Sequence, residues 1–374
     1  MTRYYFDHNA TTPVSPEVFQ AMAPLMTTVF GNASSIHQFG QEARSELDRA
    51  RRSVAAMLGA KAEEIVFTGG GTEADNTAIF GAGGHVVTTT VEHPAVLQAC
   101  QQLPEVTFVD VDNRGLVDPQ AVRAAIRRDT KLISVMHVNN ELGVIQPVRE
   151  IAEIAHAAGV WFHSDGVQAM GKIPVNVGEL GVDLYSVSAH KIYGPKGMGA
   201  LYIRKGTELR PLLYGGPHER KMRAGTENVA GAVGFGRAAE WVIGESGAEA
   251  ARQSILRDRL EHGILASIAG AHVNGSGVPR VGNTSNIRFD GIDSEPLLIA
   301  LDLKGFAVSS GSACSSGATE PSHVLAAIGL TREQARSSVR FSLGRANTEE
   351  QIDALIEAVG QVVSRLRKLA PAYV

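Results

Sequence analysis

Short runs of β-forming residues alternate with helical segments over the first two thirds of the chain. The segments 117–128 and 147–158, for example, carry apolar residues at helical spacing. The runs between such segments are continuous and apolar, as in strands that are buried on both faces of a parallel sheet. This alternation predicts an α/β fold whose ligand site lies at the carboxyl ends of the strands. The predicted strands are Ile65–Thr68, His85–Val91, Val106–Val111, Leu132–Val138, Val160–His163 and Leu184–Val187.

The chain has 374 residues, enough for two domains, and its pattern changes after Gly247. A long polar helix is predicted at 248–268, and shorter strands are predicted at 284–289 and 305–309. This change indicates a second, smaller α+β domain. The expected division is into a large and a small domain, with these bounds: 14–247 for the large one, and 1–13 together with 248–374 for the small one.

Charge and cysteine content exclude several classes of protein. A formal net charge of −4 does not favour nonspecific binding to nucleic acid or to an anionic membrane. The sequence shows no signal-peptide pattern and no apolar run of about 18 residues, so we expect a cytoplasmic protein without a membrane span. The two cysteines, Cys100 and Cys314, are too few for a disulfide framework or a tetrathiolate zinc site, and no metal site is expected.

A glycine turn, Gly69–Gly71, separates the first predicted strand from a helix. Thr72 and Asp75 have the spacing of a helix N-cap and its N3 partner, so we expect the helix to begin at Thr72. Main-chain N–H groups in such a turn can hold a phosphate. Two alternatives stay open at this point. The turn also fits a loose dinucleotide fingerprint, with Glu92 spaced for a ribose hydroxyl, and it also fits a tight turn that binds nothing.

Two further strand ends carry residues suited to chemistry. Lys191 follows the strand that ends in Ser188, and a desolvated lysine there can bind a carbonyl compound covalently. Asp165 ends the preceding strand, where a carboxylate can pair with a pyridinium nitrogen. Each residue alone also fits an ordinary role, Asp165 as a helix cap and Lys191 as a solvated loop residue. The combination with the glycine turn favours the chemical interpretation.

Motifs along nearly the whole chain resemble those of pyridoxal-phosphate enzymes of aminotransferase class V, and more narrowly the NifS/IscS-type cysteine desulfurases. The resemblance implies a large cofactor-binding domain with a mostly parallel, seven-stranded sheet between helices, and a smaller α+β domain. The motifs that carry it are Tyr5–Pro13, Thr68–Asn76, Glu92–Val96, His137–Gly143, Ser188–Gly197, Arg223–Thr226, Ser309–Cys314 and Arg340–Gly344.

The resemblance also implies roles around the cofactor ring. Lys191 would bind the pyridoxal phosphate covalently, and Asp165 would pair with the ring nitrogen. His93 would stack on the ring and shuttle protons. Asn140 and Gln168 would tune the ring hydroxyl.

Other implied roles concern the phosphate and the substrate. Thr226 would reach the phosphate from a second subunit, which implies a homodimer. Arg340 and Asn32 would hold the carboxylate of the substrate, a task that suits a guanidinium group. The remaining phosphate ligands would be Gly71, Thr72, Ser188 and His190.

Cys314 lies among glycine and serine residues, in a segment that is easily reoriented. A thiolate there is the best nucleophile that the chain offers, whereas Cys100 fits a small buried residue. The resemblance implies that L-cysteine is converted to L-alanine, with a persulfide on Cys314. The sulfur would pass to a scaffold protein for iron–sulfur clusters or to another sulfur acceptor.

Several alternatives remain at the level of the sequence. A selenocysteine lyase or another class-V enzyme shares most of these residues. A dinucleotide-dependent dehydrogenase would use the Gly69–Ala74 fingerprint, and a non-catalytic sulfur-carrier or scaffold-binding adaptor would need only Cys314.

Overall fold

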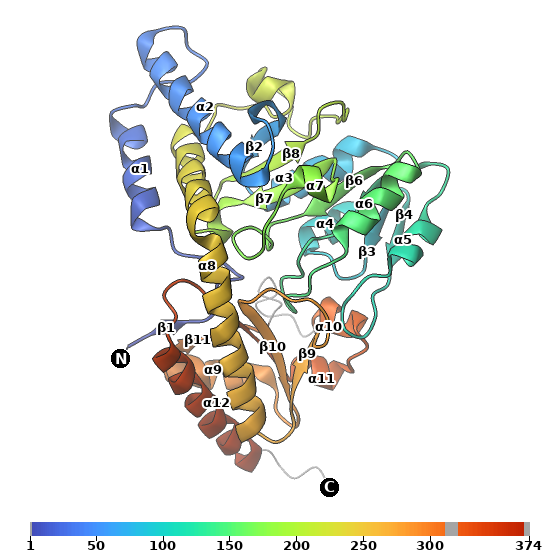
Figure 1. The fold of residues 1–374 in the computed structure, drawn as a ribbon, viewed down its shortest axis with the longest axis vertical. Helices are drawn as coiled ribbons and strands as arrows, with labels where there is room; N and C mark the ends of the chain where they lie inside the picture. Colours follow the sequence, from blue (N-terminus) through green and yellow to red (C-terminus); the bar gives the residue numbers. More distant parts are fainter. Residues whose placement is uncertain (1, 311–320, 370–374) are drawn as a thin grey trace.

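The computed structural model describes residues 2–310 and 321–369, so Cys314 lies outside the described residues. Its centre is a seven-stranded sheet with the strand order β2-β8-β7-β6-β5-β3-β4 (Figure 1). The strands of this sheet are β2 (Ile65–Thr68), β3 (His85–Thr89), β4 (Val106–Val109), β5 (Thr130–Ser134), β6 (Trp161–Asp165), β7 (Leu184–Ser188) and β8 (Gly199–Ile203).

The prediction of a mostly parallel sheet is confirmed. Strands β4, β3, β5, β6 and β7 pair in parallel, while β8 runs antiparallel to both of its neighbours, β7 and β2. All six predicted strands are present, and β8 is the one that the pattern did not reveal. β8 follows directly on the glycine-rich stretch 194–199, which obscures its apolar run.

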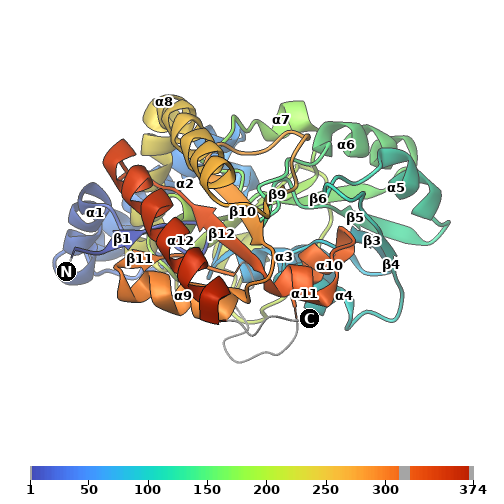
Figure 2. The same ribbon diagram turned by 90° about the horizontal axis from the view of Figure 1, so that it is seen from below.

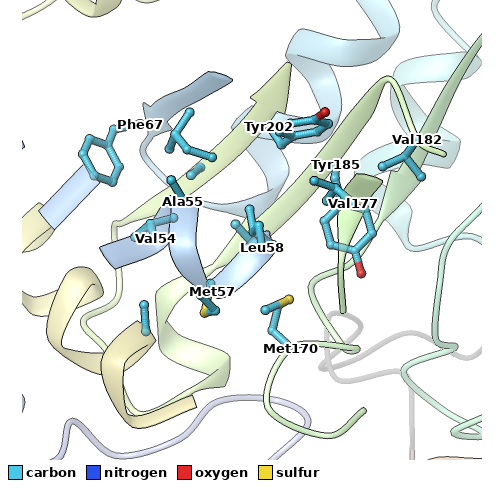
Figure 3. Close-up of a cluster of buried hydrophobic side chains, with 14 of the residues drawn as sticks. Val54, Ala55, Met57, Leu58, Phe67, Met170, Val177, Val182, Tyr185 and Tyr202 are labelled. Atoms are coloured by element: carbon cyan, nitrogen blue, oxygen red, sulfur yellow. The ribbon is translucent and has the colours of Figure 1, made fainter. Parts of the chain in front are cut away.

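Neighbouring residues of each strand belong to different apolar clusters, because successive side chains point to opposite faces of a sheet. Leu132 and Leu184 pack into the cluster that α3 and α4 cover. Ile133 and Tyr185 pack into the larger cluster on the other face, beneath α2, α6 and α8. Figure 3 shows part of this larger cluster, which includes Leu58 of α2 and the strand residue Tyr185. Both faces of the sheet are therefore buried, as the continuous apolar runs predict.

The helices of this region begin where the sequence supplies caps. The side chains of Ser15, His93 and Asp118 each accept a hydrogen bond from a main-chain N–H of the first turn. Proline follows each of these residues at the start of the helix, where its missing N–H costs nothing. The helices are α1 (Pro16–Thr27), α2 (Gln38–Leu58), η1 (Ala62–Glu64), α3 (Gly71–Ala82), α4 (Pro94–Cys100), α5 (Pro119–Ala125), α6 (Val148–Ala157), α7 (Val177–Leu180), η2 (Ala189–Lys191) and η3 (His218–Lys221).

The predicted helix at 248–268 is only the second half of a helix of 39 residues, α8 (Val229–Ser267). Its first half contains several glycines, which usually weaken a helix. Two of them are needed for close packing. A Cβ on Gly234 would lie 2.5 Å from Sδ of Met22 in α1, and one on Gly236 would lie 2.8 Å from Cα of Ala50 in α2. These glycines let α1 and α2 approach α8, and this tertiary contact is invisible in the sequence pattern.

The small domain lies below the large one in Figure 1, and α8 runs from one to the other. Its antiparallel sheet has the order β12-β10-β9, and β11 pairs in parallel with β1 (Figure 2). The predicted strand at 305–309 is shorter in the structure. The elements are β1 (Tyr4–Tyr5), β9 (Ala271–Asn274), β10 (Thr284–Phe289), β11 (Phe306–Ala307), β12 (Ser338–Ser342), α9 (Ser294–Leu303), α10 (His323–Ala327), α11 (Arg332–Arg336) and α12 (Glu349–Leu369).

The division into 14–247 and 1–13 with 248–374 remains a proposal. The two largest apolar clusters follow it, but a smaller cluster crosses it and packs Leu142 and Val144 against Val324 and Leu325. Phe6, near the N-terminus, packs with Leu256 of α8, Phe289 of β10 and Val359 of α12 in one cluster. The main cluster of the large domain ends at Val242 of the same α8.

Within the described ranges, no helix combines the length and the apolar character that a membrane span requires.

Candidate active site

The glycine turn lies between β2 and α3, at one edge of the candidate site. The prediction that Thr72 caps this helix is wrong, because α3 begins at Gly71 and its N-cap is Gly70. Gly70 has φ 153°, a conformation that favours glycine. Asp75 is 1% exposed inside the helix and serves no cap. The free N–H groups of the first turn therefore point out of a helix of 12 residues, where an anion is stabilised.

Gly71 brings the glycine turn close to two other strand ends. A Cβ at this position would lie 2.8 Å from Cγ2 of Val167 and 3.6 Å from Cβ of Ser188. Val167 follows Asp165 at the end of β6, and Ser188 ends β7. The structure therefore unites the turn with the carboxyl ends of both strands, as the sequence predicted.

Asp165 ends β6 and is buried, and one of its carboxylate oxygens accepts a hydrogen bond from the amide of Val167 at 2.9 Å. Burial raises the pKa of Asp165 to about 6, while the Val167 amide and the neighbouring Lys191 act in the opposite direction. Gln168 follows in the same turn, and its Nε2 donates to the main-chain oxygen of Asn9 at 2.9 Å. A buried carboxylate and a side-chain amide thus lie together beside the lysine.

Lys191 ends the short helix η2, directly after β7. Its Nζ donates to the main-chain oxygen of Ala10 at 2.8 Å and also to that of Asn9. His190 precedes it and pairs through Nδ1 with Oγ1 of Thr11 at 3.0 Å. The N-terminal segment therefore folds over the end of β7 and positions both predicted side chains.

His93 is the N-cap of α4, and its Nδ1 accepts a hydrogen bond from the amide of Ala95 at 3.1 Å. The neutral ring therefore carries its proton on Nε2. Burial lowers the pKa of His93 to about 4, with further contributions from Lys191 and His323. His93 and Thr72 line the same open pocket of about 460 Å³, so the histidine and the glycine turn share one cavity wall.

Arg340 lies in β12 and is 1% exposed, although it belongs to the small domain. Its guanidinium donates to a carboxylate oxygen of Asp7 at 2.6 Å and to the main-chain oxygen of Asn140 at 3.1 Å. The same oxygen of Asn140 accepts a hydrogen bond from Asn9 at 3.1 Å. The structure therefore brings Arg340, Asn140 and the N-terminal segment together at the junction of the two domains.

Asn32 and Thr226 are both exposed, unlike Arg340. Asn32 is exposed in the segment between α1 and α2, and its side chain accepts a hydrogen bond from the amide of Ser34 at 2.9 Å. That segment lies at the top of Figure 1, at the opposite end of the molecule from the small domain. Thr226 is exposed between η3 and α8. The neighbours of Thr226, Gly225 and Glu227, line a pocket together with Gly69 of the glycine turn.

Of the two cysteines, the structure describes only Cys100, which is the small buried residue that the sequence predicted. Cys100 is fully buried at the end of α4, and burial raises the pKa of its thiol to about 12. It is therefore a packing residue with no reactive thiolate at neutral pH. The predicted nucleophile Cys314 lies outside the described residues.

The burial of Glu92 excludes the alternative of a dinucleotide site at the glycine turn. The fingerprint requires this carboxylate to face a ribose, but Glu92 is 0% exposed. Its Oε1 accepts hydrogen bonds from the Thr89 hydroxyl at 2.7 Å and from the Met136 amide at 3.0 Å. Burial raises the pKa of Glu92 to about 8, so its carboxyl group is largely neutral near pH 7.

The sequence reasoning missed Asn9 and Lys172, which connect the site residues. The side chain of Asn9 donates to Thr284 in β10 at 2.8 Å, and its main-chain amide donates to Ser342 in β12 at 3.0 Å. Lys172 donates to Oδ1 of Asn9 at 2.9 Å and to Oε1 of Gln168. Asn9 stands in a polar N-terminal motif, and that motif is the only hint that the sequence alone offered.

Comparisons with known proteins identify the family of this chain. A model of the family "Aminotransferase class-V" matches residues 4–355. The chain belongs to this family, among its NifS/IscS-type cysteine desulfurases. The enzyme is 47% identical to the cysteine desulfurase IscS of Dictyoglomus turgidum over 98% of this chain and 96% of that protein.

Solved structures of related proteins have the same fold. One NifS-like protein superposes with a TM-score of 0.91 at 37% identity, covering 98% of this chain and 100% of its own. The structure of SspA in complex with cysteine superposes with a TM-score of 0.81 at 35% identity, covering 91% of this chain and 99% of its own. These likenesses extend over both domains of the enzyme.

Pyridoxal phosphate is the cofactor of this family, and the enzyme depends on it. The residues present fit the group. A buried carboxylate, Asp165, is available for a ring nitrogen, and the amine of Lys191 lies near it. The close approach at Gly71, which a Cβ would block, leaves the N-terminus of α3 open to a phosphate.

Proposed function

We propose that this enzyme converts L-cysteine to L-alanine and carries the released sulfur as a persulfide on Cys314. The observation that supports this most is the meeting of Lys191, Asp165 and the Gly71 turn at the carboxyl ends of β2, β6 and β7. The bound cofactor supplies an electron sink that weakens the bonds at the α-carbon of the substrate. Membership of the cysteine desulfurases supports L-cysteine as the substrate.

Each side chain of the site has a distinct task in this proposal. Lys191 would hold the cofactor covalently through its Nζ. Asp165 would keep the ring nitrogen protonated when it is ionised. Burial opposes that ionisation by raising its pKa, whereas the Val167 amide and Lys191 favour it. His93 moves a proton at Nε2, the nitrogen that its cap leaves available. Gln168 and Asn140 bind the ring oxygen.

The remaining side chains bind the two anionic groups. Arg340 holds the substrate carboxylate from the small domain, with Asn32 of a second subunit. Thr226 reaches the phosphate from that subunit as well. The phosphate ligands within one subunit are Gly71, Thr72, Ser188 and His190.

Sulfur transfer begins when the Cys314 thiolate attacks the sulfur atom of the substrate. A sulfur–sulfur bond forms and the carbon–sulfur bond breaks, so the electron pair of the broken bond stays with carbon. That carbon then takes up a proton, and L-alanine leaves. The persulfide passes its outer sulfur to an acceptor, which we propose to be a scaffold protein of iron–sulfur cluster assembly.

A cytoplasmic location remains a prediction from the sequence.

The surface of α1 and α2 supports the proposed homodimer. Large apolar side chains are exposed on these two helices and on the segment that joins them, and the rings of Phe30 and Phe39 are 5.6 Å apart. Such a patch is typical of an interface between subunits. The exposed residues are Phe19, Met26, Phe30, Ile36 and Phe39. Size measurement by light scattering should give a dimer, and the variant Phe30→Glu should shift it toward monomer.

The decisive experiment incubates the purified enzyme with L-cysteine and measures alanine and protein persulfide. We expect one alanine per sulfur released, and one persulfide per subunit. Cys314→Ala should form neither product, while the matched variant Cys100→Ala should form both. Persulfide in Cys314→Ala would contradict the proposed nucleophile, and absence of alanine from the holoenzyme would contradict the proposed reaction.

A parallel assay that measures turnover of L-selenocysteine distinguishes a cysteine desulfurase from a selenocysteine lyase. A desulfurase should turn over cysteine at a comparable or higher rate than selenocysteine. A lyase should react with selenocysteine alone.

A further inference from the structure

Lys172 is a second lysine close to Lys191, and the proposed reaction does not use it. It stands in the turn between β6 and α7 and is partly buried. Its Nζ donates to two side-chain oxygens, Oε1 of Gln168 and Oδ1 of Asn9 at 2.9 Å. It also lines a small cavity of about 20 Å³ together with Lys191 and His8.

The neighbours of Gln168 determine which way its amide faces. The main-chain oxygen of Asn9 can only accept, so it requires Nε2 of Gln168 on its side, and the distance is 2.9 Å. On the other side, Nζ of Lys172 has at least two N–H groups in either protonation state, and it donates one to Oε1 of Gln168 and one to Oδ1 of Asn9. The two contacts agree, and they leave the second N–H of Nε2 for another acceptor.

Asn9 is held by its own contacts, so this arrangement does not depend on one flexible side chain. Its Nδ2 donates to the main-chain oxygen of Asn140 at 3.1 Å and to the hydroxyl of Thr284 at 2.8 Å. Its Oδ1 then faces Lys172 and also accepts from Asn283 at 3.1 Å. Lys172 therefore bridges a fixed asparagine and the amide of Gln168.

We propose that Lys172 is a positioning residue that fixes the amide of Gln168 so that its Nε2 donates to the ring oxygen of the cofactor. This inference rests on the role of Gln168 given under the proposed function. Without Lys172, Oε1 of Gln168 would lose its donor in a partly buried site, and the amide could turn. The ring oxygen would then lose a hydrogen bond that stabilises its ionised form.

Charged and titratable groups from several elements face this network and must be considered in any pH experiment. They come from the N-terminal segment, from the residues after β7, from β12 and, acting on His8, from α8. Burial together with Lys191 and Arg340 lowers the pKa of Lys172 itself. The groups are His8, Lys191, Tyr193, Arg340 and Glu249.

The test is a pH titration of the visible absorbance of the holoenzyme without substrate. Lys172→Met should raise the midpoint by about one pH unit, which corresponds to a tenfold change in the equilibrium. Gln168→Leu should raise it similarly. In the double variant the shift should not exceed that of Gln168→Leu alone, because Lys172 acts through Gln168. Lys304→Met, which changes an exposed lysine of the small domain, should leave the midpoint unchanged.

The outcomes separate the inference from the proposed function. If Gln168→Leu moves the midpoint and Lys172→Met does not, or if the two shifts add in full, the positioning role is wrong. If neither variant moves it, the role of Gln168 itself is wrong, and the inference falls with it. Should Lys172→Met fail to fold, Lys172→Gln, which keeps an N–H donor, should raise the midpoint less than Gln168→Leu does, and a shift that adds in full to that of Gln168→Leu would overturn the proposal.

Discussion

The acidic and the basic sides of the site are both buried, but different contacts balance them. On the acidic side, burial raises the pKa values of Asp75, Glu92 and Asp165. In the described part of the chain, Oδ1 of Asp75 and Oε2 of Glu92 have no hydrogen-bond partner. On the basic side, Lys172 and Lys191 donate to neutral oxygens of the chain.

This difference indicates how one site can contain so many ionisable groups. The acidic side becomes neutral by binding protons, because its carboxyl groups have few donors around them. The basic side provides oxygen acceptors for its N–H groups, and Asp7 pairs with Arg340 at 2.6 Å. Burial also lowers the pKa of Lys172, so this side is only partly balanced by its contacts. We therefore infer that Asp165, the one of these three acids whose pKa Lys191 lowers, carries most of the charge of the acidic side.

The largest expected effect is on the basic side. Lys191→Ala should abolish the visible absorbance of bound cofactor and reduce alanine formation below detection, because no other amine replaces its covalent bond. Lys131→Ala, an exposed lysine of β5, is the matched control and should keep both. A variant that retains a covalently bound cofactor would show that Lys172 or another lysine can take over the role.

Asp165→Asn should have the next largest effect and tests the acidic side. It removes the charge that we assign to the ring nitrogen, and kcat should fall by about 10²–10³-fold, typical for the loss of one preorganised electrostatic group. Asp129→Asn, an exposed carboxylate before β5, should leave kcat unchanged. An equal loss of kcat in both variants would mean that Asp165 acts only through the net charge of the protein and has no specific contact with the ring nitrogen.

Gly166→Ala tests how tightly the acidic side is packed. A Cβ here would lie 2.0 Å from the ring of Tyr185, a buried residue whose hydroxyl bonds to Nδ1 of His137 at 2.8 Å. Overpacking of this kind should lower the free energy of unfolding by about 1–3 kcal/mol in urea denaturation. Gly360→Ala in α12, where the added methyl meets nothing within 4 Å, should not destabilise the protein. Unchanged stability of Gly166→Ala would show that Tyr185 can move aside.

Glu92→Gln should have the smallest effect of these variants at about pH 4.5 and below, where Glu92 is protonated in both the folded and the unfolded protein. The pKa of Glu92 is about 8 in the folded protein and 4.5 for the unperturbed group, so folding favours its protonated form. Its contribution to stability is complete below about pH 4.5 and is lost as the pH rises through about 8. Urea denaturation between pH 5 and about pH 9 should therefore show a smaller loss of stability with pH in Glu92→Gln than in the wild type. The same loss in both proteins would contradict a neutral Glu92.

Much of the site was predictable because its signals are local. The strand ends at Asp165 and Ser188 follow directly from apolar runs, and a parallel sheet brings such ends to one edge. The contact of Gly71 with Val167 is a consequence of that geometry. The prediction of an N-cap at Thr72 was wrong because the helix already begins at Gly71. Its N-cap is Gly70, which has φ 153° and makes no side-chain capping hydrogen bond.

Other features depend on residues that are far apart in the sequence. Asn9 contacts Thr284 and Ser342, more than 250 positions away, so no local pattern could assign it to the site. The first half of α8 is rich in glycine and looks unfavourable for a helix until α1 and α2 are packed against it. The exclusion of a dinucleotide site also required the fold, because only burial shows that Glu92 cannot face a ribose.

The sequence by itself determined the α/β class, the mostly parallel sheet and the family, because these follow from residue periodicity and from motifs of fixed spacing. The tertiary structure alone decided which groups are charged and which way they face. Desolvation and hydrogen-bond partners set the pKa values of Asp165 and His93, and contacts from the N-terminal segment and Lys172 set the orientation of Gln168. Both depend on what surrounds a side chain in space, which spacing along the chain does not encode.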